Sequence, residues 1–212
     1  MGDFLYGLSP ECIAVAITHL ADSDPVMAQL VSECGHCTLS ESEYRPFHTL
    51  TRAILGQQLS SQAAESIVRR LSKVVSVPFT PENFLAVPVD LLKASGLSAP
   101  KIRYILELAG RITTGRLTMD ALVHLSDEEV LKTLMEVPGI GPWTAEMFLI
   151  FGLKRPDVLS LGDAGLQRSA KMLYRESYEG EKGPNLLARV STGWRPYRSV
   201  ASWYLWKYLD SR

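Results

Sequence analysis

Several features are scarce in this chain of 212 residues, and each scarcity excludes a class of protein. There are only three cysteines, all within the first 37 residues, which is no disulfide framework. No run of about 18 apolar residues is present, so no transmembrane helix is predicted. The first residues lack the basic and then apolar pattern of a secretory signal. The net charge of −1 argues against strong electrostatic binding by the whole surface. We therefore expect a soluble intracellular protein.

Helical periodicity is present along almost the whole chain. A helix-start signal recurs at Ser9-Pro10, Asp24-Pro25 and Thr80-Pro81, where a capping residue precedes proline at the first helical position. Residues 126–129 form a capping box ahead of an apolar helix face. Only residues 74–77 resemble a strand. The sequence therefore predicts an all-α fold of about ten short helices.

The most informative segment spans residues 131–151. It predicts a helix, a tight turn at Pro138-Gly139-Ile140-Gly141, and a second helix that begins at Pro142 and ends at Gly152. The two glycines predict positive φ and close backbone approach, with Ile140 between them as an apolar plug. The free N–H groups and dipole of the second helix would favour a phosphate. An ordinary helical hairpin with a glycine turn is the alternative at this point.

A Gly162-Asp163 pair follows the hairpin at a predicted loop-to-helix junction. From about Tyr44 to its C-terminus, the chain resembles the helix-hairpin-helix superfamily of DNA base-excision glycosylases. Within that superfamily it is most similar to the alkylpurine branch of 3-methyladenine DNA glycosylase II type. Three blocks carry the likeness: residues 52–60, residues 137–145 running on to 163, and residues 194–199 followed by 203–206.

The resemblance implies a two-lobed helix-hairpin-helix fold with a DNA cleft between the lobes. Residues 1–40 and 154–212 would form one discontinuous helical lobe, and residues 41–153 a second lobe carrying the hairpin at about 130–151. No additional N-terminal β domain is expected, because the likeness begins at about Tyr44. The implied partner is double-stranded DNA containing damaged bases. We expect a monomer with no membrane association, in the cytoplasm if the source is bacterial and in the nucleus if it is eukaryotic.

The implied reaction is hydrolysis of the N-glycosidic bond of alkylated purines such as 3-methyladenine and 7-methylguanine. Asp163 matches the family's catalytic aspartate, whose carboxylate stabilises positive charge on the sugar and orients or deprotonates water. Capping of the following helix is the alternative role for Asp163. Trp143 stands where relatives that also cut the DNA strand have a lysine nucleophile, so a monofunctional enzyme is implied. Gly162 replaces a second acid found in some relatives.

Other residues match the family's binding elements. The implied substrate pocket comprises Trp143, Met147, Trp206, Trp203 and Tyr204. Trp143 would stack on a cationic purine, with simple packing on the hairpin as the alternative. The implied DNA-binding hairpin comprises Pro138, Gly139, Ile140, Gly141 and Thr144. The implied intercalating loop comprises Gln57, Gln58, Leu59 and Ser60. Gln58 and Leu59 are both candidates for the wedge that fills the gap left by a flipped base, and a Leu59 turned into the core is the alternative.

The implied reaction requires no cofactor. Relatives hold a monovalent cation, Na⁺ or K⁺, through main-chain carbonyls at the positions of Met135, Val137 and Ile140. No iron–sulfur cluster is expected, because no cysteine follows Cys37. Cys34-Gly-His-Cys37 matches the tetrapeptide of thiol oxidoreductases but lacks the surrounding βαβ pattern. Two alternatives remain: a non-catalytic binder of abasic or damaged DNA with the same fold, and a thiol redox or metal module at Cys34 and Cys37.

Overall fold

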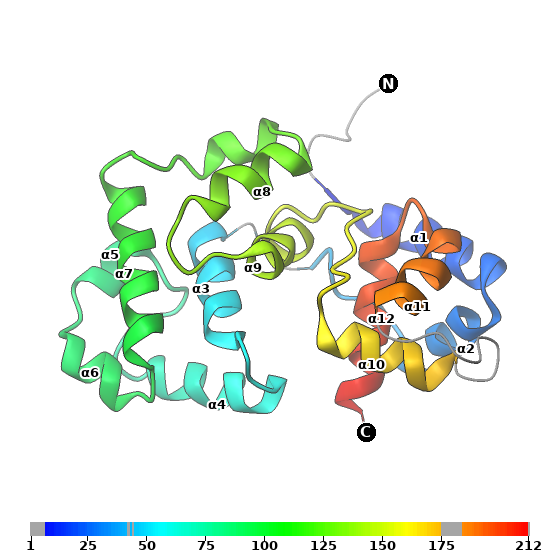
Figure 1. Ribbon diagram of the computed structural model, residues 1–212, viewed down its shortest axis with the longest axis horizontal. Coiled ribbons are helices and arrows are strands. Elements are labelled where there is room, and N and C mark those ends of the chain that lie inside the picture. Colours follow the sequence, from blue (N-terminus) through cyan, green and yellow to red (C-terminus); the bar gives the residue numbers. More distant parts are fainter. Residues whose placement is uncertain (1–6, 42, 44, 175–183, 212) are drawn as a thin grey trace. The chain divides into compact units, whose positions relative to one another are not determined.

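The computed structural model describes residues 7–41, 43, 45–174 and 184–211 of the chain (Figure 1). Within these ranges it contains twelve α-helices and no strand, which confirms the predicted all-α class. The strand-like residues 74–77 lie in turns and bends instead. No helix in the described part of the chain combines the length and apolarity needed to cross a bilayer. The chain divides into two compact units, residues 1–43 with 154–212, and residues 44–153.

The first unit joins the two ends of the chain. Helix α12 packs against α1, α2 and α10, and Asp24 connects distant segments. Its Oδ1 caps α2, while its Oδ2 accepts hydrogen bonds from the Tyr174 hydroxyl at 2.6 Å and the Trp194 indole N–H at 2.8 Å. The elements of this unit are α1 (Pro10–Ser23), α2 (Pro25–Cys34), α10 (Ala164–Leu173), α11 (Pro184–Val190), the 3₁₀ turn η4 (Ser191–Trp194) and α12 (Arg198–Asp210).

The second unit is a continuous stretch of chain built around buried aromatic residues. Phe79, Phe84 and Phe148 are fully buried, and Phe79 and Phe84 meet edge to face at 5.4 Å. The elements of this unit are α3 (Pro46–Gly56), α4 (Ser61–Leu71), α5 (Pro81–Leu85), α6 (Val89–Ala94), α7 (Ala99–Thr113), the 3₁₀ helix η2 (Asp120–His124), α8 (Asp127–Met135), α9 (Pro142–Met147) and the π-helical turn η3 (Phe148–Gly152).

The predicted helix starts are confirmed by cap geometry. The side chains of Ser9, Asp24 and Thr80 each accept a hydrogen bond from a backbone N–H in the first turn of the following helix. Ser126 and Glu129 form the predicted capping box, because Glu129 accepts from the Ser126 N–H at 2.8 Å and Ser126 accepts from the Glu129 N–H at 3.3 Å. These starts therefore follow from local sequence.

Candidate functional site

Asp163 lies at the junction between an irregular loop and α10, as the sequence predicts. Its Oδ1 accepts hydrogen bonds from the Leu166 backbone N–H at 2.8 Å and from the Trp206 indole N–H at 3.1 Å. The first bond makes Asp163 the N-cap of α10, so the capping role is confirmed. Asp163 is only 7% exposed. The carboxylate is thus held by two donors and cannot rotate without losing them.

Gly165 is a residue that sequence reasoning missed in this arrangement. A Cβ added there would lie 3.0 Å from Asp163 Oδ1 and 3.4 Å from Trp206 Cδ1. The first contact is tighter than most Cβ contacts in proteins, and the second is at the lower limit of ordinary van der Waals contact. Glycine therefore leaves room for the indole to reach the carboxylate. The only sequence signal was its position two residues after Asp163, within the first turn of the predicted helix.

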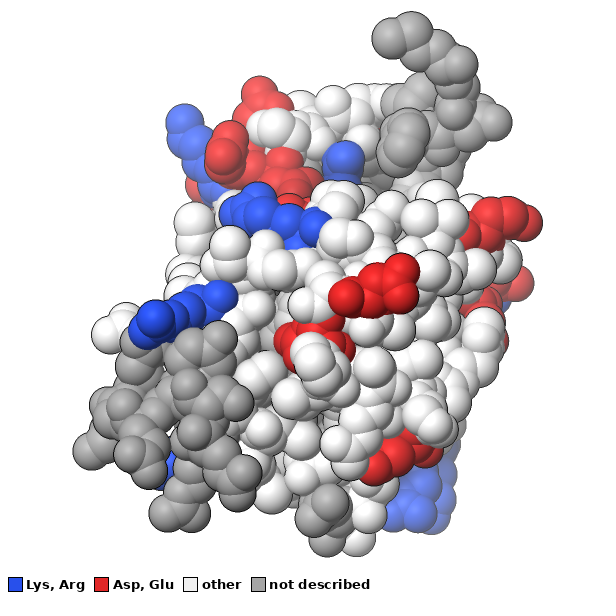
Figure 2. All heavy atoms as spheres, turned by 90° about the vertical axis from the view of Figure 1, so that its right-hand side faces the viewer, with Lys and Arg blue, Asp and Glu red and all other residues white. Residues whose placement is uncertain are grey.

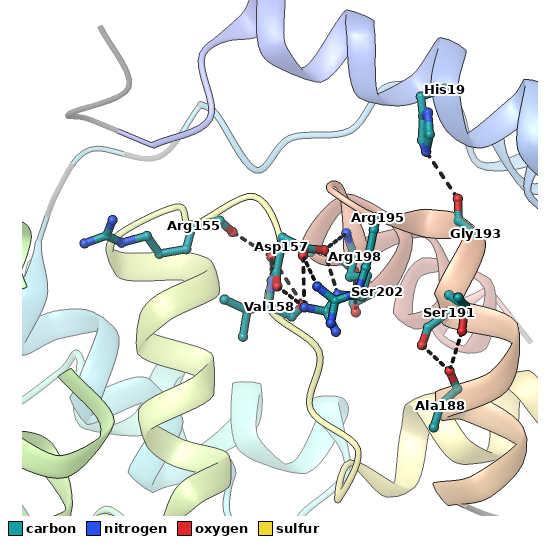
Figure 3. Close-up of polar contacts among 12 residues, drawn as sticks. His19, Arg155, Asp157, Val158, Ala188, Ser191, Gly193, Arg195, Arg198 and Ser202 are labelled. Atoms are coloured by element: carbon teal, nitrogen blue, oxygen red, sulfur yellow. Dashed lines mark hydrogen bonds and ion pairs between the residues drawn. The ribbon is translucent and has the colours of Figure 1, made fainter. Parts of the chain in front are cut away.

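The loop before Asp163 is tied to the start of α12 by a cluster of charged and polar groups (Figure 3). Asp157 accepts from Arg198 Nε at 2.6 Å, from Arg198 Nη2 at 3.0 Å and from Arg195 Nη1 at 3.1 Å. The Ser199 hydroxyl donates to the Arg155 carbonyl at 2.6 Å and accepts from the Val158 N–H at 3.0 Å. The block at residues 194–199 therefore anchors the loop that leads to the aspartate.

The aromatic residues of α12 occupy different environments. Trp206 is half-buried and bonded to Asp163. Trp203 is also half-buried and contacts Tyr204 edge to face at 5.0 Å. Tyr204 is fully buried, and its hydroxyl donates to the Gly35 carbonyl at 3.0 Å. Burial raises the pKa of Tyr204 well above its ordinary value. The ring of Tyr204 is thus buried inside the unit and its hydroxyl is hydrogen-bonded there, while the pocket role that the resemblance implies stays a prediction.

The predicted hairpin is present as α8, a tight turn and α9. Ile140 is 4% exposed, as expected for an apolar plug. Gly139 has φ of +88°, but Gly141 has φ of −97°, so the expectation of positive φ is wrong for the second glycine. A Cβ on Gly139 would lie 2.1 Å from the Tyr104 ring, whereas a Cβ on Gly141 would meet nothing within 4 Å. Glycine is thus required at the first position, and the second position faces open space.

The loop between α3 and α4 lies against this hairpin. Gln57 Nε2 donates to the Gly139 carbonyl and to Thr144 Oγ1, both at 2.8 Å. Within the implied intercalating loop, Gln57 therefore bridges to the hairpin. Leu59 is 40% exposed, so the alternative of a Leu59 turned into the core is wrong. Gln58 is exposed with φ of +58°, and Ser60 caps α4.

Trp143 and Met147 lie one turn apart on α9 but differ in exposure. Trp143 is half-buried, and its Cη2 atom lies 3.7 Å from the position that a Cβ on Gly56 would take. Met147 is only 5% exposed and contributes to the core. The pocket role that the resemblance implies for Met147 stays a prediction. Trp143 packs along the end of α3 and keeps part of its ring accessible.

The carbonyl groups implied as cation ligands lie where α8 ends. Helix C-termini leave carbonyls without intrahelical partners, and Met135 is the last residue of α8. The Val137 carbonyl accepts one hydrogen bond, from the Ile140 N–H at 3.1 Å, and a carbonyl oxygen has a second lone pair. Main-chain oxygens are suitable ligands for hard cations. The residues present therefore fit the implied group.

The environment of the cysteines in residues 34–37 disfavours the thiolate form that a reactive cysteine needs. Cys34 is the last residue of α2 rather than a residue at a helix N-terminus. Burial raises the pKa of the Cys37 thiol to about 11, and it also raises the pKa of Cys34. No group of three metal-ligating side chains exists among the described residues. These findings oppose the redox and metal interpretation.

Two further surface features can be described, a face of mixed charge and a hollow. Acidic and basic side chains are interspersed on the face drawn in Figure 2, without a patch of one sign. A hollow of about 580 Å³ in the second unit is lined by the N-terminal end of α3, the C-terminal end of α7 and neighbouring loops, among them Arg45, Phe79 and Asp120. It includes none of the predicted site residues.

Comparison with known proteins places these features in one family. Residues 51–194 match the model of the HhH-GPD superfamily of base excision DNA repair proteins. Because this match covers more than half of the chain, the chain belongs to that superfamily, whose enzymes are DNA glycosylases.

Individual relatives make the likeness more specific. The chain is 33% identical to DNA-3-methyladenine glycosylase 1 of Schizosaccharomyces pombe, over 89% of this chain and 84% of that protein. A solved structure of a 3-methyladenine DNA glycosylase from the same organism, in complex with abasic DNA, matches with a TM-score of 0.76 and 31% identity over 92% of this chain and 97% of that one. The crystal structure of a DNA-3-methyladenine glycosidase from Bacillus halodurans matches with a TM-score of 0.71 and 36% identity, over 94% and 88% of the two chains.

Proposed function

We propose that this protein is a monofunctional DNA glycosylase that flips alkylated purines out of duplex DNA and hydrolyses their N-glycosidic bond. The observation that carries the proposal is the Asp163 carboxylate, which the Leu166 N–H and the Trp206 indole hold in place and which the resemblance matches to the family's catalytic aspartate. The names of the relatives support 3-methyladenine as a substrate, and we extend the proposal to 7-methylguanine because that base carries the same kind of positive charge. The proposed partner is double-stranded DNA with damaged bases, bound by a monomer in the compartment that holds the DNA.

The chemistry follows from charge. Breaking the N-glycosidic bond develops positive charge on the sugar, and a fixed carboxylate stabilises that charge without reorganising. Asp163 would also orient or deprotonate the attacking water. Alkylated purines carry positive charge that already weakens the bond, and the accessible part of the Trp143 ring suits stacking on such a cationic base. Trp143 has no amine to attack the sugar, so the product would be an abasic site with an intact strand.

The hairpin and the loop between α3 and α4 would bind the DNA. Gly141 is exposed in the hairpin turn, and backbone N–H groups at this turn would bind a phosphate. The carbonyls of Met135, Val137 and Ile140 would hold a Na⁺ or K⁺ ion, which would add positive charge beside that phosphate. Leu59 would fill the space of the flipped base, which lowers the cost of a few kcal/mol for unstacking.

The test is single-turnover release of 7-methylguanine from duplex DNA by the wild type and by Asp163→Asn. Asparagine can still cap α10, so the variant should fold, while its loss of charge should slow release by about a hundredfold or more. Strand cleavage without added alkali would contradict the monofunctional assignment. Tight binding to abasic-site DNA without any base release would instead favour a non-catalytic binder with the same fold.

A further inference from the structure

We propose that Lys101 is a positioning residue that holds the loop of residues 57–60 in one conformation and so presents Leu59 for insertion into DNA. This inference rests on the proposed function, because insertion matters only if a base is flipped. Lys101 lies in the first turn of α7, in the same unit as the loop. It matches none of the sequence blocks that define the site.

The side chain of Lys101 makes two contacts with the end of α3. Its Nζ donates to the Leu55 carbonyl at 2.7 Å and to the Gln57 carbonyl at 3.0 Å. These carbonyls belong to the last turn of α3 and the residue after it, where intrahelical donors are missing. A cation there is also favoured by the negative end of the helix dipole. Lys101 is half-buried, and its burial lowers its pKa. Its ammonium group thus closes the helix at the point where the loop begins.

The side chain of Gln57 connects the start of the loop to the hairpin. Its carbonyl is held by Lys101, while its amide donates to Gly139 and Thr144 on the hairpin. Tyr104, one turn further along α7, lies over Gly139. Helix α7 therefore supports the loop through Lys101 and the hairpin through Tyr104. The loop and hairpin are connected to the same rigid helix.

The conformation that results is one the loop would not hold unaided. Gln58 adopts φ of +58°, which costs energy for a residue other than glycine. Leu59 is kept 40% exposed, although an apolar side chain is stabilised by burial. Contacts at Gln57, immediately before these two residues, hold them in place. Without Lys101 the loop would relax. Binding to DNA would then have to order it, which costs conformational entropy and weakens binding.

The experiment uses the full chain and the variant Lys101→Met, which keeps the aliphatic stem and removes the charge. Insertion is read from the fluorescence of 2-aminopurine placed beside an abasic analogue in duplex DNA, at saturating protein. Base release is read from single-turnover excision of 7-methylguanine from a second duplex of the same sequence, which carries 7-methylguanine in place of the abasic analogue. We expect Lys101→Met to lose most of the fluorescence increase and to excise about tenfold more slowly. Lys101→Arg, which retains a cation and several donors, should recover part of both signals.

Lys93→Met is the matched control, because Lys93 is an exposed cation of the same unit that pairs only loosely with Asp90 at 3.3 Å. It should behave as the wild type, which separates the loop effect from the loss of one positive charge. Urea unfolding checks that each variant is folded. If Lys101→Met does not fold, Lys101→Gln tests the same attachment, because it keeps a hydrogen-bond donor but loses the charge and reach of the ammonium group, and it should lower the fluorescence in the same way.

The outcomes distinguish this inference from the proposed function. Wild-type fluorescence and wild-type excision in folded Lys101→Met would overturn the role of Lys101 and leave the glycosylase assignment intact. A wild type that raises the fluorescence but releases no base would overturn the assignment, while a weaker fluorescence signal in Lys101→Met would still support the positioning role. Equal effects of Lys93→Met and Lys101→Met would also overturn the positioning role of Lys101.

Discussion

At the scale of single residues, Asp163 resolves two roles that the sequence left as alternatives. Its Oδ1 caps α10 and accepts from Trp206, and an ionised carboxylate has about four acceptor positions on its two oxygens. Capping therefore does not compete with catalysis. The Leu166 N–H that is capped at the start of α10 and the Trp206 indole N–H together fix the direction of the carboxylate. Asp163 can be both a structural residue and the proposed catalytic one for this reason.

The two glycines of the hairpin turn should differ in how much stability an alanine substitution costs. In Gly139→Ala the new Cβ would overlap the Tyr104 ring at 2.1 Å, and the alanine would have to adopt φ of +88°. We expect the free energy of unfolding to fall by about 2–4 kcal/mol. Gly141→Ala is the matched control, because its Cβ meets nothing within 4 Å at φ of −97°. Urea denaturation measures both variants.

Near-equal stabilities of the two alanine variants would contradict this account of the turn. Such a result would mean that the Tyr104 ring can move aside and that the turn tolerates a side chain at its first position. The comparison is informative because the two glycines are separated by one residue and would be interchangeable in a sequence pattern.

At the scale of elements, the loop before α10 is positioned by contacts from α12. Asp157 binds Arg198 through two side-chain hydrogen bonds and Arg195 through one. The two arginines differ in environment, because the Arg198 side chain is 18% exposed and that of Arg195 is 60% exposed. Desolvated pairs cost more to break than exposed ones, since the remaining charge cannot be fully hydrated. Arg198 should thus contribute more than Arg195 to the free energy of unfolding.

Replacing each arginine by methionine tests this difference. Arg198→Met should lower the free energy of unfolding by about 2 kcal/mol, between the values for fully buried and for exposed pairs. Arg195→Met should lower it by less than about 1 kcal/mol. Urea unfolding gives the two values. Base excision should also slow in Arg198→Met, because the loop that carries Asp163 loses its anchor. A larger loss of stability in Arg195→Met would show that the assignment of the dominant contact is wrong.

At the scale of the whole molecule, the stability of the chain should depend on pH through His48. Its Nδ1 accepts a hydrogen bond from the Phe79 N–H at 3.1 Å, so the ring is neutral when this bond forms. Burial, together with the charges of Arg52 and Arg45, lowers the pKa of His48 from 6.5. The unfolded state therefore binds the proton first as pH falls. Stability from His48 is complete above about pH 6.5 and is lost below it.

His48→Gln should remove this part of the pH dependence. We expect the ratio of unfolding free energies at pH 7.5 and pH 5.5 to move closer to one in the variant than in the wild type. His124→Gln, which changes an exposed histidine of the same unit, serves as the control and should leave the ratio unaltered. Urea denaturation at the two pH values supplies the data. An unchanged ratio in His48→Gln would show that the neutral ring is not what the folded state requires.

Prediction from the sequence succeeded where the signal is local. The caps at Ser9, Asp24 and Thr80, the capping box at Ser126 and the buried plug at Ile140 all involve residues a few positions apart. It failed where the partner is distant in the chain. Gln57, Lys101 and Gly165 gave no pattern that revealed their contacts, because each acts on a group that only folding brings near. The burial of Tyr204 and Met147 was likewise not foreseen, because their pocket roles came from the resemblance, which does not show how far each side chain is buried in this chain.

The sequence by itself determined the helical class, the helix starts, the hairpin and the family, since these depend on periodicity, short-range hydrogen bonds and ordered motifs. Tertiary structure alone decided how the functional groups are held. It brought the Trp206 indole to Asp163, tied residues 155–158 to α12 and set Lys101 against the end of α3. The physical reason is that a half-buried polar group takes whichever donor or acceptor folding places within about 3 Å, and that partner has no fixed separation along the chain.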